Sequence, residues 1–468
     1  MAAALGFYFT LGFLFQLPEL ALLWRARELG FPPSIFGVVG GISSLPWTLK
    51  PVWGYVVDSV HRPLWQWCAM CLLTWLGGWY ALTTDNITPT VFALSALSGS
   101  FSLCFSDVIV DSVTVVHVRD CERPDQSGLF QTRIWQARAV GGLLAAVIGG
   151  VGVQTLGSIP VFYACMVLVI PSLAALIWDS EFQGMYRAKQ EQRHARENAI
   201  TSHNNCAHSV TQVCAPTLRG MVLFTFVISA VPSIGAFLAY YIIEHHVSAT
   251  NMMLIDVVDY AARSIGATLW HRYLRAVPYR KLFSISTLVI VALKACNFML
   301  LASWINEPWH YTLVAAMDGA ALCIATQVLV LPIMCYVAKA TARGSEGTTY
   351  ATAISISNLG GLVSAMLGSA IGEAMGVGTD GRYDALGELI AVTTALALAP
   401  LVVVRMVPRG ITAHTRTAVQ STPTPTPDSG VELQRRSPDM VVTPMPMPVH
   451  AEAGANDEDG GDATSNTV

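Results

Sequence analysis

The sequence predicts an all-helical membrane protein with twelve transmembrane helices arranged in two six-helix bundles. Three observations lead to this prediction. Charged residues make up only 12% of the 468 residues, about half of their usual share in soluble domains. Hydrophobic residues make up 53%, and they gather in runs of about 20 residues, the length that crosses a bilayer. These runs fall into two sets of six, one on either side of a polar segment.

The elements follow one another along the chain as apolar runs, with a polar segment in the middle and a polar end. The first six spans are expected near 4–24, 34–57, 64–83, 90–117, 131–152 and 158–178, and the second six near 220–243, 250–271, 282–303, 310–338, 348–375 and 385–405. We therefore predict a first bundle over 1–178, a cytoplasmic loop over 179–217 and a second bundle over 218–405. Residues 406–468 are rich in Pro and Thr and then acidic. We predict a disordered cytoplasmic tail there, because so few apolar residues cannot offset the entropy of ordering.

The positions of lysine and arginine predict the orientation in the membrane. With the N-terminus in the cytoplasm, the inner loops and the tail carry 19 of these residues, and the outer loops carry Arg25, Arg27 and Arg382. Cytoplasmic loops are enriched in positive charge. Both termini are therefore expected in the cytoplasm of a multi-pass protein. Either the plasma membrane or an organelle membrane, such as that of a plastid, fits these observations.

The two sets of spans share a pattern of small and acidic residues. A glycine pair is followed, seven residues after its second member, by a third glycine. The pattern occurs at Gly141, Gly142 and Gly149 and again at Gly360, Gly361 and Gly368, while Gly54 matches Gly266 and Asp107 matches Asp318 at similar offsets. Two parallel six-span repeats are the layout of the major facilitator fold. A chance coincidence within glycine-rich helices is the alternative explanation.

The densest motif runs from Leu45 to Asp58, at the end of the second span. Gly54 and Asp58 are four residues apart, so the glycine could let two helices approach while the carboxylate meets a helix N-terminus or a cation. We interpret this pair as a gate. An ordinary helix end capped by an aspartate is the alternative. Within the same motif, Lys50 lies at membrane depth, where an ammonium must be paired or hydrated, and Trp47 offers a ring for a cation–π contact.

Charged residues recur in the fourth and fifth spans. Asp107 and Asp111 are four residues apart and therefore share a helix face, and Arg133, Trp135 and Arg138 open the next span. We expect at least one Asp–Arg ion pair between the two spans. Its role could be purely structural, or these residues could bind substrate and couple transport. Ionisable residues inside a membrane favour the second interpretation.

The second set of spans carries its own charges. Asp259 and Arg263 have the spacing of a helical ion pair, whereas Asp318 stands alone in the tenth span. Asp256 fits an interfacial position as well as a site. In the first span, Glu19 follows Pro18 and is a candidate site residue at a kinked helix.

Other classes of function find less support in the sequence. Lys294 lies in a peripheral span and is expected to pack or to reach for the membrane surface. The histidines form no ligand cluster, so no metal or cofactor is expected. No arrangement of a nucleophile and a base predicts an enzyme, and no basic run predicts nucleic-acid binding.

Together these stretches resemble the folate–biopterin transporter family, a branch of the major facilitators found in kinetoplastids, plants, algae and cyanobacteria. The resemblance covers about residues 5–400. It rests on the Leu-Pro-Trp, Lys-Pro, Gly and Asp positions of 45–58, on Ser106-Asp107 with Asp111-Ser112, on Trp135 with Gly141-Gly142, and on 344–348 with Ser357-Asn358-Leu359-Gly360-Gly361. The resemblance implies a carrier of folates and unconjugated pteridines that is coupled to protons.

The side chains in these spans suit such a substrate. A carboxylate can accept the adjacent N–H donors of a 2-amino-4-oxopteridine, aromatic rings can stack on it, and folate's carboxylates need Arg or Lys. The residues concerned are Trp47, Lys50, Asp107, Asp111, Arg133, Trp135 and Arg138. Two alternatives stay open: a facilitator for another solute, such as a sugar, an amino acid or an organic anion, and a membrane receptor or scaffold that transports nothing.

Overall fold

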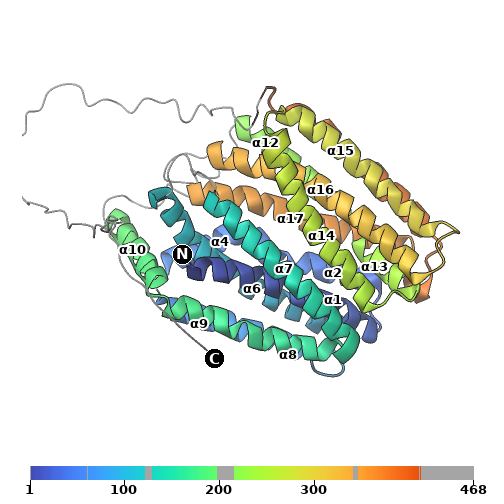
Figure 1. Ribbon diagram of the computed structural model, residues 1–468, viewed down its shortest axis with the longest axis horizontal. Coiled ribbons are helices and arrows are strands. Elements are labelled where there is room, and N and C mark those ends of the chain that lie inside the picture. Colours follow the sequence, from blue (N-terminus) through green and yellow to red (C-terminus); the bar gives the residue numbers. More distant parts are fainter. Residues whose placement is uncertain are drawn as a thin grey trace, which may run out of the picture. The chain divides into compact units, whose positions relative to one another are not determined.

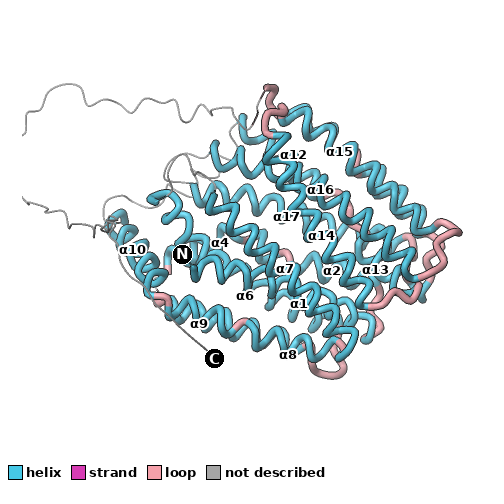
Figure 2. The backbone as a smooth tube through the Cα atoms, viewed as in Figure 1, coloured by secondary structure: helices cyan, strands magenta, loops and turns pink. Residues whose placement is uncertain are grey.

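The computed structural model describes residues 2–60, 62–121, 129–197, 216–340, 346–410 and 412, which belong to one compact unit. Every regular element in these ranges is a helix (Figures 1 and 2). The predicted all-helical class is therefore confirmed. The loop residues 198–215 and the predicted tail from 413 onward lie outside the described residues.

The helices follow the predicted spans closely. The first half comprises α1 (Ala2–Glu28), α2 (Pro33–Ser43), α3 (Leu45–Thr48), α4 (Lys50–Ser59), α5 (Leu64–Ala81), α6 (Pro89–Cys121), α7 (Leu129–Leu156), α8 (Ser158–Leu168), α9 (Ile170–Trp178) and α10 (Ser180–Glu197). The second half comprises α12 (Pro216–Ser229), α13 (Gly235–Glu244), α14 (Ala249–Leu269), α15 (Tyr279–Cys296), α16 (Pro308–Ala340), α17 (Glu346–Ala374), α18 (Leu386–Leu396) and α19 (Pro400–Val403), with short π or 3₁₀ turns at 270–274, 297–301, 379–381 and 404–406. The start of the predicted central loop is thus helical, as α10.

Within the described ranges, eight helical segments are long and apolar enough to cross a membrane. The four other predicted spans also contain helices, but each departs from a long apolar one. Prolines interrupt two of them: the range 34–57 is divided into α2, α3 and α4, and 220–243 into α12 and α13. The helix α5 is rich in tryptophan and glycine, and α14 carries three charges. The count of twelve spans and the division into two bundles therefore stay predictions.

The repeated glycines have equivalent surroundings in the two halves. A Cβ at Gly141 would overlap the carbonyl of Phe9 in α1, and a Cβ at Gly368 would overlap the carbonyl of Ser233, between α12 and α13. In both places a glycine lets its helix pack directly on the backbone of the first span of its own half. This correspondence favours an internal repeat over a chance coincidence.

The two halves meet through α2 against α17 and α7 against α14. At Gly41 a Cβ would lie 3.0 Å from the methyl group of Met366, and at Gly142 it would lie 2.6 Å from the ring of Tyr260. Small residues therefore bring helices of the two halves into close contact. Some of the charged residues predicted from the sequence, among them Arg138 of α7 and Asp259 of α14, belong to the helices that make these contacts.

Candidate functional site

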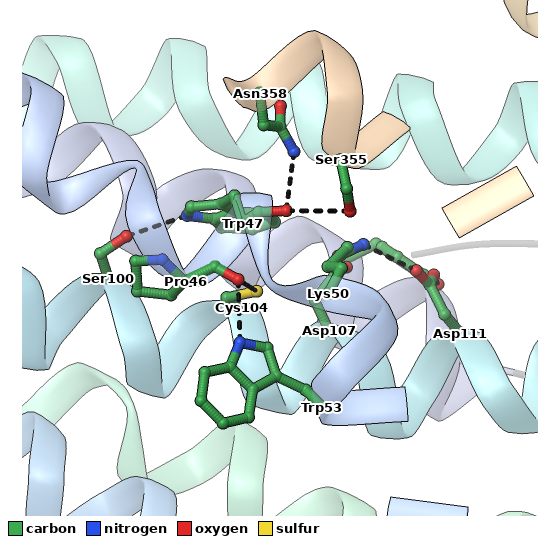
Figure 3. Close-up of polar contacts among 11 residues, drawn as sticks. Pro46, Trp47, Lys50, Trp53, Ser100, Cys104, Asp107, Asp111, Ser355 and Asn358 are labelled. Atoms are coloured by element: carbon green, nitrogen blue, oxygen red, sulfur yellow. Dashed lines mark hydrogen bonds and ion pairs between the residues drawn. The ribbon is translucent and has the colours of Figure 1, made fainter. Parts of the chain in front are cut away.

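The helix is interrupted between α3 and α4, and this interruption exposes a backbone acceptor in the site. In a continuous helix the N–H of residue 51 would donate to the carbonyl of Trp47, but Pro51 has no N–H. That carbonyl instead accepts a 3.0 Å hydrogen bond from Asn358 Nδ2 and a 3.4 Å bond from Ser355 Oγ, both on α17 (Figure 3). A proline in the first half thus creates an acceptor that the second half uses.

The side chain of Trp47 is held by its own half. Its indole N–H donates to Ser100 Oγ on α6 at 2.9 Å. The neighbouring carbonyl of Pro46 accepts from Trp53 Nε1 at 2.9 Å and from Cys104 Sγ at 3.2 Å (Figure 3). Trp47 therefore bridges the halves, because its ring is fixed on α6 and its carbonyl on α17.

Lys50 lies one helical turn further along and is 8% exposed. Its ammonium contacts Asp107 Oδ2 at 2.5 Å and Asp111 Oδ2 at 3.0 Å (Figure 3), and Tyr8 also donates to Asp111. The ion-pair partner of the 3%-exposed carboxylate of Asp107 is thus Lys50 of α4, and not an arginine of the fifth span, so Asp107 does not form the expected Asp–Arg pair. The predicted contact of Lys50 with Trp47 is confirmed, with Nζ 5.5 Å from a ring centroid.

Arg138 has different surroundings. Its guanidinium carbon lies 5.6 Å from the ring of Phe15, 5.7 Å from that of Trp47 and 5.6 Å from that of Trp135. Among the described residues no carboxylate lies within ion-pair distance of Arg138. Cation–π contacts can hold a guanidinium in place and leave its N–H donors for an anion. Arg138 is therefore the cation of this site that is best placed to bind a negatively charged group.

A second polar group lies between α1 and α14. Gln16 Nε2 donates to Asp256 Oδ2 at 3.1 Å, and Tyr260 Oη donates to Gln16 Oε1 at 2.9 Å. Arg263 lies 5.7 Å from the ring of Tyr260. Gln16 belongs to the first half and its partners to the second, so this group also joins the halves.

The predicted ion pair of Asp259 with Arg263 is wrong in its geometry. Arg263 turns toward the ring of Tyr260, whereas Asp259 packs beside Gly319 of α16, where a Cβ would lie 2.6 Å from Oδ1. That oxygen is buried and has no hydrogen-bond partner. The two residues are nevertheless charged neighbours, and Arg263 also neighbours the exposed carboxylate of Glu19.

The sequence suggested that Asp318 stands alone in its span, but in the structure it has a charged neighbour. Lys294 on α15 is its charged neighbour, so this lysine faces a carboxylate inside the second half. Oδ1 of Asp318 is buried without a hydrogen-bond partner.

Three predicted residues remain, and two of them lie apart from these groups. Arg133 is exposed and, among the described residues, makes no contact that would place it in the site. A Cβ at Gly54 would meet no atom within 4 Å, so the close helix approach expected there is absent. Asp58 lies near the end of α4, but its side chain is outside the described residues. Within the part of the chain that the structure describes, no group of three potential metal ligands occurs.

Several hydrogen-bond partners of the site residues were not predicted from the sequence. They are Tyr8, Gln16, Ser100, Tyr260 and Ser355. Gln16 offered a signal, because it is a polar residue within an apolar run. Asn358 was part of a quoted motif, but its partner 311 residues away was not foreseeable from spacing.

Comparison with known proteins shows the family of the chain. The model of the BT1 family matches residues 16–423. The chain belongs to the BT1 family. A "Folate-biopterin transporter" of Synechocystis is 28% identical, over 88% of this chain and 82% of that protein. The "Folate transporter 1" of Plasmodium falciparum is 20% identical, over 80% and 73%.

The BT1 chain also resembles a solved structure. The crystal structure of a point mutant of the nucleoside transporter NupG aligns with a TM-score of 0.62 and 12% identity, and the match covers 86% of this chain and 98% of NupG. This likeness shows that the two chains share a fold. The protein is thus a membrane transporter with multiple apolar helices, and the names of its relatives point to transport rather than to an enzyme.

Proposed function

We propose that this protein is a secondary transporter of folates, pteridines or both, and that transport is coupled to protons. In this proposal two six-helix bundles alternate the access to the substrate site, and both termini lie in the cytoplasm. The observation that carries the proposal is the guanidinium of Arg138, which has no carboxylate within ion-pair distance among the described residues and lies over three aromatic rings. The names of the relatives support this choice of substrate.

The two cations of the first half have different tasks in this proposal. Lys50 already has two carboxylates, so it organises α4 and α6 and is poorly placed to attract an anion. Arg138 binds a carboxylate of the substrate. Phe15 and Trp135 are 43% and 49% exposed, and their rings offer flat surfaces on which a pteridine can stack.

The carboxylates between α1, α14 and α16 support the coupling to protons. Asp259 and Asp318 each hold one buried oxygen without a partner, and Glu19 is an exposed carboxylate near Arg263. A carboxylate in such surroundings changes its charge by taking up a proton and thereby changes its attraction to neighbouring cations. We propose these three residues as the proton-coupling group.

The first experiment measures uptake by the purified protein in liposomes. Arg138→Gln should raise the KM for folate at least about tenfold, because the loss of a charged hydrogen-bonding partner costs about 2 kcal/mol or more. The KM for biopterin, which has no carboxylate, should rise far less. Arg133→Gln, which removes an exposed cation earlier on the same helix, is the matched comparison and should change neither value strongly.

A second measurement tests the coupling. An imposed proton gradient should drive folate accumulation above equilibrium, and a protonophore should abolish that accumulation while leaving exchange intact. Folate accumulation that does not depend on the proton gradient would contradict the proposed proton coupling. Equal effects of Arg138→Gln on folate and biopterin would remove the assigned role of Arg138.

One alternative is favoured by the same residue. A guanidinium among aromatic rings also suits other aromatic carboxylates. Competition by a panel of such anions against folate uptake separates the two substrates, since a carrier for another organic anion would prefer a competitor that lacks the pteridine ring.

A further inference from the structure

Gln16 of α1 forms a buried hydrogen-bonded bridge to α14. Gln16 is 4% exposed, and its carboxamide lies between Asp256 and Tyr260 of α14. The chemistry of the partners defines its orientation. A carboxylate only accepts, so the Gln16 amide N–H donates to it at 3.1 Å, and the phenol donates to the Gln16 oxygen at 2.9 Å.

A carboxamide presents an N–H donor beside a C=O acceptor. The lactam edge of a 2-amino-4-oxopteridine presents the same pattern, with its N–H donors next to the 4-oxo acceptor. We propose that Asp256 and Tyr260 bind the lactam edge of the transported ring, and that the carboxamide of Gln16 occupies their hydrogen-bonding groups until the substrate replaces it. This inference rests on the proposed function and names the part of the site that recognises the ring.

The surroundings of Tyr260 agree with this role. Its ring packs where Gly142 has no side chain, since a Cβ there would lie 2.6 Å away, so the hydroxyl is held in a defined position. Arg138 is a charged neighbour of Tyr260 and lies over Phe15, the residue that precedes Gln16. The proposed ring site therefore adjoins the proposed anion site.

The exchange also has a consequence for transport. Gln16 comes from α1 and its two partners from α14, so their hydrogen bonds connect the halves. A substrate that takes over Asp256 and Tyr260 releases Gln16 and thereby removes this connection. Binding of the ring would thus be linked to the relative movement of the two halves.

The test compares KM values for biopterin in liposomes. Asp256→Asn and Tyr260→Phe should each raise KM about fivefold or more, because each removes one hydrogen-bonding partner of the ring. Gln16→Ala should lower KM, because it removes the internal competitor. Tyr241→Phe is the matched control, since its hydroxyl donates to the Leu300 carbonyl at 3.4 Å within the second half, and it should leave KM unchanged.

Other results would overturn the inference. If the bridge is merely structural, Gln16→Ala will raise KM and lower the yield of inserted protein, as the loss of any buried hydrogen bond would. Unchanged KM values in both Asp256→Asn and Tyr260→Phe would exclude these residues from ring recognition.

A ligand series adds a readout that does not depend on folding. A 2,4-diaminopteridine has an amino group in place of the 4-oxo acceptor, so it should compete less well than pterin against wild-type protein, and this difference should shrink in Tyr260→Phe. Guanosine carries the same lactam edge on a purine. Uptake of guanosine without uptake of pteridines would contradict the proposed substrate. The KM for guanosine in Asp256→Asn and Tyr260→Phe would then test the lactam site separately.

Discussion

Lys50 and its two carboxylates show how a charged group becomes stable within the membrane-spanning part of the chain. Lys50 and Asp107 are 8% and 3% exposed and form an ion pair at 2.5 Å. Desolvation of such charges is costly, and the loss of either one leaves its partner buried and unpaired. Asp111, whose side chain is 43% exposed, retains contact with water. Stability therefore depends mainly on the buried pair.

We expect Lys50→Met to destabilise the protein by about 3–5 kcal/mol, because it leaves Asp107 buried beside a second carboxylate. Adding Asp107→Asn to this variant should restore most of the loss. The measurement is thermal unfolding in detergent. Asp111→Asn alone should cost about 1 kcal/mol or less. A double variant as unstable as Lys50→Met would contradict the importance of the buried pair.

The interrupted helices α2, α3 and α4 link the two halves through a backbone defect. Pro51 removes the donor that Trp47's carbonyl would otherwise have, and α17 supplies Asn358 and Ser355 in its place. This explains why a motif with two prolines and a motif with Ser and Asn occur in the same chain. A continuous helix would satisfy its own carbonyls and offer α17 nothing to bind.

Pro51→Ala and Asn358→Ala should shift the conformational balance in the same direction, away from the state in which α3 and α17 touch. Each should change the ratio of states about fivefold, since a net hydrogen bond contributes about 1 kcal/mol. The readout is the distance distribution between spin labels placed on the two halves. Asn297→Ala, whose amide bonds the Lys294 carbonyl within the second half at 3.1 Å, should have no effect.

The combined variant is decisive for this explanation. Pro51→Ala supplies an N–H that competes with Asn358 for one carbonyl, so the two changes should not add. Two independent, additive shifts would show that Pro51 and Asn358 act through different contacts.

Across the whole described unit, the halves are also joined by charge. Arg27 of α1 contacts Glu244 of α13 at 2.6 Å and lies 5.9 Å from the ring of Tyr240. Nearby, burial raises the pKa of Tyr383 to about 12, with Glu244 adding to the rise, so its phenol stays neutral at physiological pH. This contact lies at the ends of α1 and α13, apart from the bridges made by Gln16 and Trp47. The halves must release this contact if they are to separate at that end.

Arg27→Glu should favour the separated state, because it places two carboxylates together, and Arg27→Glu with Glu244→Arg should restore the original balance. The side chains are 28% and 46% exposed, so the effect should be at most about fivefold, as for a pair worth about 0.2–1 kcal/mol. The same label distances measure it. The shift should diminish in high salt, and a shift that salt leaves unchanged would speak against an ion pair.

The tail provides a prediction that rests on composition. Truncation after residue 410 should leave uptake per inserted molecule nearly unchanged, because residues 411–468 have too few apolar side chains to build a core. Uptake must be normalised to the amount of inserted protein. A transport defect in correctly inserted, truncated protein would show that the tail takes part in the cycle.

Composition and pattern were sufficient for the fold class and for most helix positions. Hydrophobic length is a local property, so apolar runs predict spans without knowledge of their neighbours. The polar positions within those runs were equally visible, and Trp47, Lys50, Asp107 and Arg138 do gather around one another. The glycine pattern predicted an internal repeat, and the structure adds that Gly141 of α7 and Gly368 of α17 pack on backbone.

The choice of partner among these polar groups required the folded chain. Asp107 could face Lys50 or Arg138 on spacing alone, and only the packing of α4 against α6 selects the lysine. Asp259 and Arg263 have the right separation for a pair, yet Asp259 packs beside Gly319 of α16 and Arg263 lies over the ring of Tyr260. Gln16 and Asp256 are 240 residues apart. Hydropathy and charge depend on the residue itself, whereas a hydrogen bond depends on where a second residue lies, and distant segments meet only when the helices pack.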